Sequence, residues 1–411
     1  MADIDLSRFD FWLQPQEVRA AAFSVLRDAP ELLRFDEPDE GLGLDTGSRP
    51  GFYAVSKYDD VRDVCRNDAT FRSAPTNFTI GDPPPGSNAG NMISTDNPEH
   101  ARLRRIVQSA YNAPRVAQLE ELFEAEARRL VGEAAGSGEC DFVESIAAEL
   151  PLATTCMMMG VPPSDRQTVL QASHTIITMG SDPDYGVGGE KAEAVLNAAM
   201  AVAGVMYELY PDRLATPRDD VTSSLVHANA DGEALTADEL ASFFLLLIVG
   251  GIETTIAALS NGLWALTQYE KQRRLWQADP HGLALSGANE IVRWTTPLMW
   301  SRRTVAMPTT LSGTDLVEGD KLMVLYASAN RDEAAFESPA TFDVARSPNN
   351  HFGHGAPGEH FCLGAHLSRR EIAALFRELA SLGGDFEATA PPTPVQSNIY
   401  DGVRSLKCRI G

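Results

Sequence analysis

The sequence predicts one large, mainly helical globular unit, and three observations support this expectation. No linker rich in proline, serine and glycine, no low-complexity tract and no internal repeat divides the 411 residues. Apolar residues make up 44% of the chain, which is sufficient for a sizeable core. Apolar side chains recur at helical spacing in several long stretches, whereas the pattern of a short strand stands out at residues 51–57.

Each expected element follows from a local pattern. Residues 51–57 are rich in β-branched and aromatic side chains, and helical spacing begins directly after them. Thr236 and Glu239 form the signature of a capping box ahead of a long apolar helix, which we expect to run to about residue 269. Residues 74–95 are rich in proline, glycine and asparagine and are expected to form a long loop. Further helices are expected at residues 17–33, 58–67, from 96 onwards with Asp96 or Asn97 as the cap, 114–134, and 164–209 with a break at 180–189.

Net charge and cysteine usage exclude several classes of protein. A net charge of −23 argues against nucleic acid and anionic membranes as partners. The five cysteines are scattered, odd in number and without paired metal spacing, which argues against a disulfide framework and fits a reducing compartment. The charged N-terminus does not resemble a signal peptide, and the longest apolar run, residues 243–252, is too short to cross a bilayer. We therefore expect a cytoplasmic protein that is not inserted in a membrane.

Cys362 ends a glycine-rich loop that begins at His351, and it is the most informative residue of the chain. Residues 365–379 after it have helical spacing without glycine or proline. A sulfur at a helix N-terminus is stabilised as a thiolate by free backbone N–H groups and by the positive end of the helix. Three interpretations compete: a structural buried cysteine, a nucleophile with His360 as its base, and the proximal ligand of a haem. A base only two residues upstream on the same loop is an awkward geometry for the nucleophile.

The residues around Cys362 resemble the cysteine loop of the cytochrome P450 family, the haem-thiolate monooxygenases. That loop reads Phe-Gly-x-Gly, a spacer, a basic residue, a spacer and Cys-x-Gly, and it is matched in order by Phe352, Gly353, Gly355, His360, Cys362 and Gly364. Residues 356–359 fill the place of the first single spacer, so the loop is three residues longer than the family pattern. Counted strictly back from Cys362, Gly358 would be the second glycine and Gly355 would replace the aromatic residue. We prefer an insertion that keeps Phe352, because an aromatic ring beside the sulfur shields it from water.

Three basic residues elsewhere match the family's contacts with the haem propionates. His100 and Arg104 are four residues apart on one helical face, so both could donate to a single anionic group. Taken alone, such a pair is also what a solvated basic face looks like. The resemblance implies that His100, Arg104 and, on a later strand, Arg303 bind the propionates.

The middle of the long helix matches a second family motif. Gly250 and Gly251 each weaken a helix by about 1 kcal/mol, so their presence needs a reason. A tolerated bend with Glu253 facing solvent is one explanation. The resemblance implies another, in which the helix is thinned and kinked to admit a flat cofactor and O2. Glu253 and Thr254 would then be the acid and alcohol that deliver protons to the bound oxygen.

Glu290 and Arg293 form a Glu-x-x-Arg pattern whose spacing lets the two side chains meet on a helix. A surface ion pair of this kind contributes only about 0–1 kcal/mol. The resemblance implies instead a buried structural lock below the haem, completed by Thr341 or Arg346. We do not count this lock among the catalytic groups.

The resemblance covers about residues 50–410 and implies the cytochrome P450 fold: mainly α with a small β-rich region (α+β), in a single domain, residues 1–411. The β-rich part would comprise about residues 35–75, 295–330 and 390–411, and the helical part about residues 96–290 and 350–385. The implied cofactor is haem b, with Cys362 as the metal ligand. Its contacts are expected from His100, Arg104, Gly251, Arg303, Phe352, Gly355, His360, Cys362 and Gly364. An apolar substrate is expected to contact Leu247, Val249, Gly250, Leu298, Met299, Trp300 and Ile399.

The implied reaction inserts one oxygen atom from O2 into a C–H bond of an apolar small molecule, such as a sterol, terpenoid, branched lipid or secondary metabolite. No flavin or NAD fingerprint is present, so electrons are expected from a ferredoxin with a ferredoxin reductase. The ferredoxin would dock on a basic patch formed by Arg102, Arg105, Arg369 and Arg370. Two alternatives remain: a peroxygenase driven by peroxide, and a haem-thiolate sensor without catalysis, which would have no use for Glu253 and Thr254.

Overall fold

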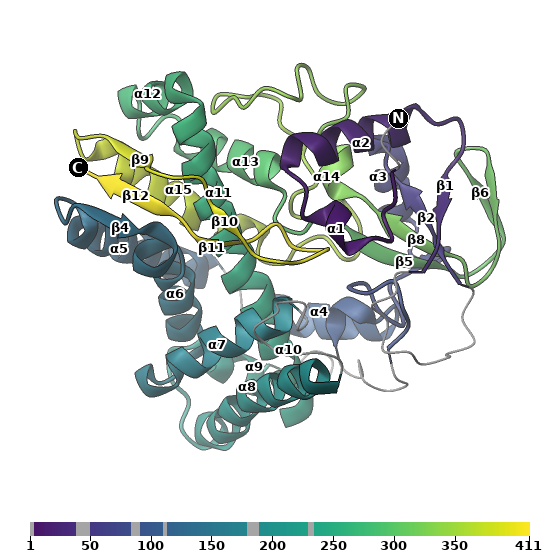
Figure 1. The fold of residues 1–411 in the computed structure, drawn as a ribbon. Coiled ribbons are helices and arrows are strands. Elements are labelled where there is room, and N and C mark those ends of the chain that lie inside the picture. The colour runs from purple at the N-terminus through teal and green to yellow at the C-terminus, as the bar shows by residue number, and fades with distance from the viewer. Residues whose placement is uncertain (1–3, 38–49, 84–90, 110–112, 179–188, 229–233) are drawn as a thin grey trace.

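A helical column of 32 residues, Ala237–Gln268, passes through the middle of the molecule (Figure 1). It comprises α10 (Ala237–Ile248), a π-helical turn (Val249–Glu253) and α11 (Thr254–Gln268). The predicted capping box is present: Thr236 Oγ1 accepts a hydrogen bond from the Glu239 N–H at 3.2 Å, and the Glu239 carboxylate accepts one from the Thr236 N–H at 2.8 Å. The column is long and apolar enough to cross a membrane, but 56% of its most apolar window is buried inside the fold, as in a core helix.

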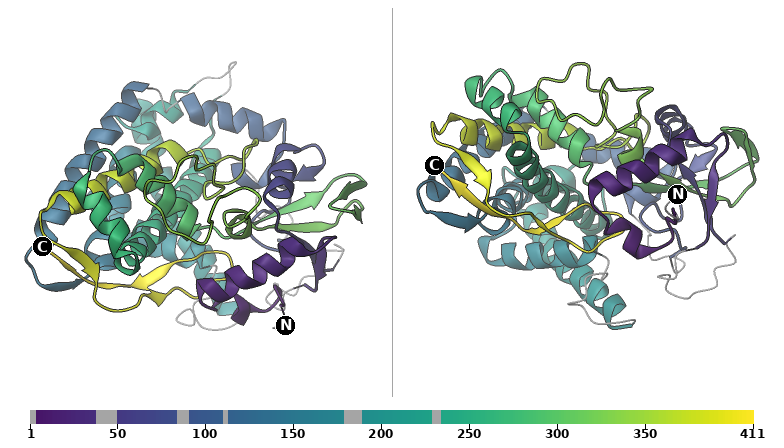
Figure 2. Two further views of the ribbon diagram at one scale, coloured as in Figure 1. Left: turned by 90° about the horizontal axis from the view of Figure 1, so that it is seen from above. Right: turned by 45° about the horizontal axis from the view of Figure 1, so that its top comes forward.

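Helices surround this column on most sides (Figures 1 and 2). The computed structural model describes residues 4–37, 50–83, 91–109, 113–178, 189–228 and 234–411. The helices predicted at residues 58–67 and 114–134 are confirmed, and the helix predicted from residue 96 begins at Glu99. The helix predicted at residues 17–33 is present but ends at Asp28, and Leu33 already belongs to a strand. The described helices outside the column are α1 (Phe9–Trp12), α2 (Gln16–Asp28), α3 (Tyr58–Arg66), α4 (Glu99–Ser109), α5 (Ala113–Ala134), α6 (Glu149–Met159), α7 (Arg166–Ile177), α8 (Gly189–Ala215), α9 (Val221–Val226), α12 (Glu270–Ala278), α13 (Ala284–Thr295), α14 (Tyr326–Ala329) and α15 (Ala365–Ser381).

A five-stranded sheet with the order β1-β2-β8-β5-β3 lies on the side of the molecule that carries the N-terminus (Figure 1). Its strand β2 (Phe52–Val55) confirms the strand predicted at residues 51–57. β2 runs parallel to β8 (Lys321–Val324), and β5 (Ser301–Val305) runs antiparallel to β8. This register places Arg303 of β5 opposite Leu322 of β8. The remaining strands on this side are β1 (Leu33–Phe35), β3 (Phe71–Arg72), and the β6 (Thr309–Leu311) and β7 (Thr314–Leu316) hairpin.

One strand falls inside the part of the chain that was expected to be helical. β4 (Glu139–Asp141) pairs with the C-terminal β12 (Lys407–Ile410), which also pairs with β9 (Phe386–Ala388). Three residues carry too little periodicity to reveal such a strand, and its partner lies far along the chain. Cys140 and Cys408 face each other across this sheet as free thiols 3.6 Å apart, consistent with the expected absence of a disulfide framework. A further hairpin joins β10 (Thr393–Pro394) to β11 (Val403–Ser405).

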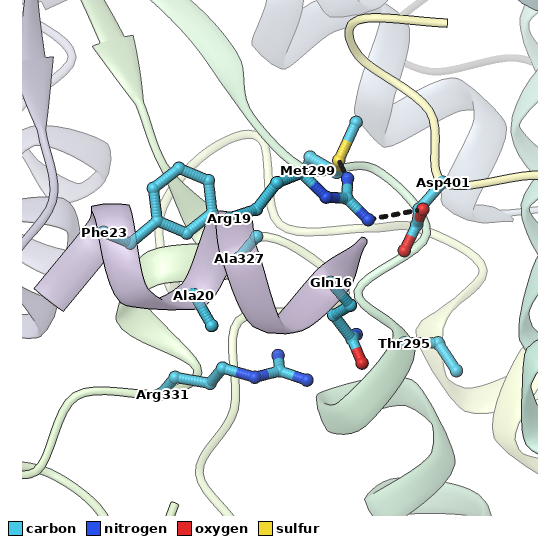
Figure 3. A pocket seen from close by; sticks show the side chains of 9 residues that line it. All are labelled: Gln16, Arg19, Ala20, Phe23, Thr295, Met299, Ala327, Arg331 and Asp401. Atoms are coloured by element: carbon cyan, nitrogen blue, oxygen red, sulfur yellow. Dashed lines mark hydrogen bonds and ion pairs between the residues drawn. The ribbon is translucent and has the colours of Figure 1, made fainter. Parts of the chain in front are cut away.

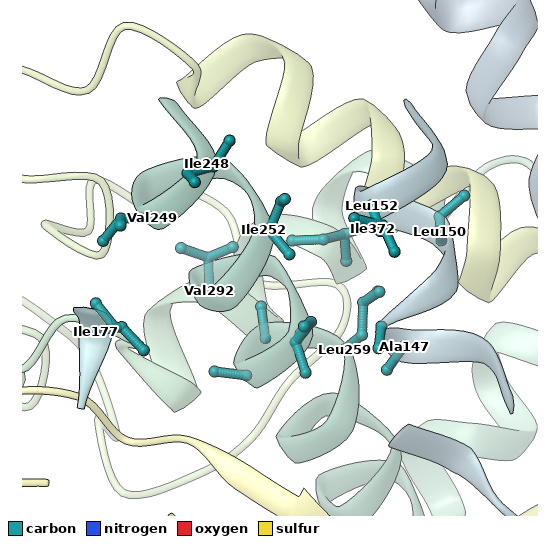
Figure 4. Close-up of a cluster of buried hydrophobic side chains, with 14 of the residues drawn as sticks. Ala147, Leu150, Leu152, Ile177, Ile248, Val249, Ile252, Leu259, Val292 and Ile372 are labelled. Atoms are coloured by element: carbon teal, nitrogen blue, oxygen red, sulfur yellow. The ribbon is translucent and has the colours of Figure 1, made fainter. Parts of the chain in front are cut away.

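The column packs into one large hydrophobic cluster with the helices around it. At Gly262 a Cβ atom would lie 3.0 Å from Ile291 of α13 and 3.1 Å from Phe376 of α15, so glycine lets three helices approach closely. Figure 4 shows the part of this cluster around the π-helical turn, where the column meets α6, α7, α13 and α15 through Leu150, Leu152, Ile177, Ile248, Val249, Ile252, Leu259, Val292 and Ile372.

The predicted lock between Glu290 and Arg293 is a buried ion pair on α13. Both side chains are fully buried, and the Arg293 guanidinium lies 2.7 Å from the Glu290 carboxylate. Arg346 completes the lock with a second ion pair to Glu290 at 3.1 Å. Thr341 contributes its backbone oxygen, which accepts a hydrogen bond from Arg293 at 3.1 Å. Both predicted candidates therefore take part, one through its side chain and the other through its main chain.

Glu371 on α15 is a buried acid that makes stability depend on pH. Its carboxyl accepts a hydrogen bond from Thr154 of α6 at 2.7 Å, and burial raises its pKa to about 7. The unfolded chain ionises this group near pH 4.5, whereas the folded protein keeps it protonated up to about pH 7. Stability from this group is therefore fully present below pH 4.5 and falls by about 3 kcal/mol as the pH rises to 7.

The side chain introduced by Glu371→Gln cannot ionise, so this variant is expected to keep the stability that the native chain loses as the pH rises. The difference in unfolding free energy between the variant and the native chain should grow by about 3 kcal/mol between pH 4.5 and pH 7.5 in urea titrations. Glu144→Gln, an exposed carboxyl, is the control and should show no such trend. Parallel pH profiles for Glu371→Gln and the native chain would contradict the prediction.

Candidate active site

The sulfur of Cys362 lies at the N-terminus of α15, as the loop and helix pattern predicted. The backbone N–H groups of Gly364 and Ala365 donate to this sulfur. Burial by the surrounding protein raises the pKa of the thiol, whereas the two N–H groups and the charges of Arg104 and Arg369 lower it. The side chain of Cys362 is nevertheless exposed to solvent-sized molecules, so the sulfur can bind a group outside the chain. A thiolate stabilised from the helix end is suited to ligate a metal.

The extra residues of the loop form a compact turn against α3. Gly355 has a φ of +79°, which favours glycine, and Ala356 is buried. A Cβ atom on Gly358 would lie 1.9 Å from the carbonyl oxygen of Cys65, at the end of α3. The N–H of Cys362 then donates to the His354 carbonyl oxygen at 3.1 Å and closes the loop. The longer loop therefore fits because Gly358 lets its backbone pack directly against the backbone of Cys65.

Phe352 is buried at the base of this loop. Its ring stacks on Tyr58 with centroids 4.1 Å apart, and its N–H donates to the side-chain oxygen of Asn330 at 2.6 Å. None of these contacts involves Cys362. Shielding of the sulfur by Phe352 therefore stays a prediction, while its role in fixing the loop to α3 is visible.

Four basic side chains predicted to bind a cofactor come together beside the cysteine loop. The rings of His100 and His360 lie 4.0 Å apart, and Arg104 donates to the Phe361 carbonyl oxygen at 2.8 Å. His100 and Arg104 come from α4, one turn apart, as expected for one helical face. Burial and, after it, the charge of Arg303 on β5 lower the pKa of His360 to about 2. Burial also lowers the pKa of His100. Both imidazoles are therefore uncharged at neutral pH and lie beside the positive charges of Arg104 and Arg303.

Two observations show that this cluster suits an anionic group. The Nδ1 atom of His100 is buried and has no hydrogen-bond partner in the described part of the chain. Arg303 is buried, and in the same part of the chain no carboxylate pairs with it; its guanidinium donates to the Arg302 carbonyl oxygen at 2.9 Å. Arg302, the next residue on β5, points to the other face of the sheet and pairs with Asp82. Buried cations without a counter-charge are costly, so the cluster fits the propionates of a haem.

The column is open toward the interior at the two predicted glycines. A Cβ atom on Gly250 would meet nothing within 4 Å, and one on Gly251 would meet only Thr155 at 3.7 Å. Packing between protein elements therefore does not require glycine here, in contrast to Gly262. The hydroxyl of Thr254 donates to the Gly250 carbonyl oxygen within the π-helical turn. The turn thus exposes main chain and a hydroxyl at the point where the resemblance places the bound oxygen.

Glu253 is buried, which excludes the alternative in which it faces solvent. Its Oε1 atom accepts a hydrogen bond from Ser173 at 3.0 Å, and its Oε2 atom lies 3.7 Å from the Nδ1 atom of His174. The hydroxyl of Tyr400 donates to the backbone oxygen of Glu253 at 2.6 Å. The carboxyl is therefore held by α7 and by the C-terminal segment. Sequence reasoning missed Ser173, His174 and Tyr400 as partners of Glu253.

Met299 and Trp300 contact the N-terminal helices. Figure 3 shows the Met299 sulfur beside the guanidinium of Arg19 on α2, which also pairs with Asp401 at 2.8 Å. The ring of Trp300 lies 6.3 Å from that of Trp12 on α1. The roles of Met299 and Trp300 in substrate binding stay predictions.

Four further residues predicted to contact substrate lie either in the column or in two segments that are hydrogen-bonded to each other. Leu247 and Val249 belong to the column, the first half-buried and the second buried. Leu298 is half-buried and bridges to Tyr400, and Ile399 is buried and accepts a hydrogen bond from the Met299 N–H at 2.9 Å. The C-terminal turn is thus joined to the segment before β5. Contact of these apolar side chains with a substrate stays a prediction.

Comparisons with known proteins agree with this site. No family model matched the chain. A methyl-branched lipid omega-hydroxylase of Mycobacterium tuberculosis strain H37Rv is 41% identical over 412 residues, which cover 99% of this chain and 94% of that protein. A steroid C26-monooxygenase of Rhodococcus jostii is 34% identical over 363 residues, covering 87% and 75%. The solved structure of Mycobacterium marinum cytochrome P450 CYP268A2 in complex with pseudoionone superposes with a TM-score of 0.91 at 35% identity, covering 99% and 98%.

The superposition covers nearly the whole chain, so the overall fold is shared with that cytochrome P450. The fold predicted from the sequence, mainly α with a small β-rich region, is therefore confirmed. Haem b is the cofactor, and the buried cations beside Cys362 are suited to its charge. The chain belongs to the cytochrome P450 family of haem-thiolate monooxygenases.

Proposed function

We propose that this monooxygenase hydroxylates a terminal carbon of a methyl-branched lipid. The observation that carries the proposal is the 41% identity, over 99% of the chain, with a methyl-branched lipid omega-hydroxylase. A steroid is the second candidate, because the steroid C26-monooxygenase is 34% identical. Both relatives oxidise apolar compounds, which agrees with the apolar residues of the column and of the C-terminal turn. We place the activity in the cytoplasm, where a soluble electron donor is available.

The side chains of the site have separate roles in this proposal. Cys362 ligates the haem iron, and His100, Arg104, Arg303 and His360 bind the propionates through donors and positive charge. The bound haem supplies the activation of O2. Apolar walls exclude water and hold the substrate over the cofactor.

Thr254 and Glu253 supply protons to the oxygen. Both lie at the end of the π-helical turn, beside the open face at Gly250. Thr254→Ala removes the hydroxyl and is expected to lower the yield of product per electron pair by about a hundredfold, the lower end of a general-acid effect, because reduced oxygen then leaves as peroxide. Product, reductant and peroxide are measured in the same reaction. An unchanged yield would favour the peroxygenase or the sensor.

The function is tested with purified holoprotein and a panel of methyl-branched fatty acids, sterols and unbranched fatty acids. Binding is followed by the Soret shift, and products are identified by mass spectrometry. Terminal hydroxylation of the branched lipids with ferredoxin, ferredoxin reductase and O2 is the expected result. Turnover with peroxide but not with ferredoxin would replace the proposal with a peroxygenase, and binding without any product would leave a sensor.

The ferredoxin is proposed to dock near the N-terminus of α15. Arg369 lies one turn into this helix, and its charge reaches the Cys362 sulfur. The four-arginine patch is less uniform than predicted, because Arg102 pairs with Glu99 and Glu239, and Arg370 lies 3.4 Å from Glu120. These carboxylates offset part of the positive charge. We therefore expect Arg369 to contribute more to docking than Arg102 or Arg370.

A further inference from the structure

The carboxyl of Glu253 is enclosed by groups that do not belong to its own helix. Ser173 and His174 come from α7, and Tyr400 comes from the segment between β10 and β11. Their sequence separations from Glu253 are 80 residues for Ser173 and 147 for Tyr400. Three side chains from two distant segments thus converge on one acid.

Among the partners described for Glu253, only one has a substantially exposed side chain. Ser173 and Tyr400 are 0% and 1% exposed, and Glu253 itself is 3% exposed. The side chain of His174 is 30% exposed, while its Nδ1 atom lies 3.7 Å from the Glu253 carboxylate. An imidazole can take up a proton on one nitrogen and release one from the other. His174 therefore joins solvent to a buried carboxyl.

Tyr400 has the features of a fixed donor. Burial and the neighbouring charge of Glu253 raise its pKa far above the usual value, so the phenol stays protonated. Its hydroxyl lies 2.6 Å from the backbone oxygen and 3.5 Å from the Oε2 atom of Glu253. A Cβ atom on Gly402 would lie 2.1 Å from the ring, so glycine at this position permits the ring to lie where it does. The phenol thereby ties the C-terminal turn to the end of the π-helical turn.

We propose that His174 is the entry point for protons that reach Glu253, and that Ser173 and Tyr400 hold the Glu253 carboxyl in place to receive them. The imidazole takes up a proton from solvent and releases one to the Glu253 carboxylate, and the carboxyl passes its proton on to the oxygen that is being reduced, so that His174 and Glu253 both regain their starting protonation state in every cycle. This assignment rests on the proposed role of Glu253 in proton delivery, and it adds the residues that supply protons to that carboxyl and hold it in place. His174 and Tyr400 are positioning residues, since they act through Glu253.

The turnover test compares His174→Gln with the native holoenzyme. Glutamine retains a donor near the carboxylate but cannot shuttle a proton. Product per electron pair is expected to fall about tenfold, and the solvent deuterium isotope effect on product formation to rise, with the substrate-induced Soret shift unchanged. Gln171→Ala, an exposed change on the same helix, should match the native enzyme in all three. Native yield and isotope effect in His174→Gln, with both altered in Glu253→Gln, would overturn the proposal.

A second measurement does not depend on turnover. Tyr400→Phe loses the hydrogen bond to the Glu253 backbone, so amide exchange across residues 249–255 of the holoprotein is expected to accelerate about fivefold. Unchanged exchange in this variant would overturn the positioning role of Tyr400. Failure of the proposed function gives a different pattern: the native enzyme forms no hydroxylated product, while the exchange difference persists.

Discussion

Cys362→Ser is expected to lose the red-shifted carbon-monoxide band of a thiolate-ligated haem and to lower hydroxylation by more than about a hundredfold. Outer partners of a metal ligand typically contribute 10–100-fold, so loss of the ligand itself should cost more. The N–H groups of Gly364 and Ala365 and the charge of Arg104 stabilise a thiolate. A serine hydroxyl does not ionise at neutral pH, so this stabilisation has no anion on which to act. The reduced carbon-monoxide spectrum and the product yield are measured on the same preparation.

The matched control is Cys140→Ser. Cys140 is half-buried on β4, in the sheet that contains the C-terminus, and its sulfur contacts that of Cys408. This variant should keep both the thiolate band and the activity. A thiolate band retained in Cys362→Ser would mean that another cysteine ligates the iron, and the site described around α15 would then be misassigned.

Local signals were sufficient to predict the column and its start. The capping box at Thr236 and Glu239 lies within four residues of chain, and the apolar run at residues 243–252 that follows is interrupted only by its two glycines. The lock on α13 was also accessible, because Glu290 and Arg293 are three residues apart. The choice between Thr341 and Arg346 was not, because it depends on where a distant segment passes. The structure uses both.

Long-range pairing explains what the sequence could not show. β4 exists because it pairs with β12, and the hydroxyl of Tyr400 reaches a backbone oxygen 147 residues away. Neither pairing leaves a periodic pattern in the local sequence. The contact between the Met299 sulfur and Arg19, which belongs to the first helices of the chain, was not foreseen, while contact of Met299 with substrate stays a prediction. Side-chain direction in such segments is decided by tertiary packing.

Arg293→Ala is expected to destabilise the fold by about 3–5 kcal/mol, because it leaves the fully buried carboxylate of Glu290 with only part of its counter-charge. The guanidinium also donates to the backbone oxygens of Asn330, Pro339 and Thr341, at 2.9, 3.0 and 3.1 Å. These acceptors belong to the segment that leads to the cysteine loop. Soluble yield, haem content and the urea midpoint should therefore all fall. Arg293→Lys should recover little, since an ammonium lacks the planar fork that serves all these acceptors.

Arg274→Ala on α12 removes an ion pair of similar length and separates the effect of burial from that of charge. Arg274 lies 2.9 Å from Glu270, and the two side chains are 61% and 60% exposed. Water solvates both groups when the pair is broken, so the expected cost is below about 1 kcal/mol. A similar loss of stability in the two variants would show that the lock contributes no more than a surface pair. We expect a large loss of stability in Arg293→Ala, a small one in Arg274→Ala, and an intermediate one in the double variant Glu290→Gln/Arg293→Met. This order would identify the unpaired buried charge of Glu290 as the cause of the loss.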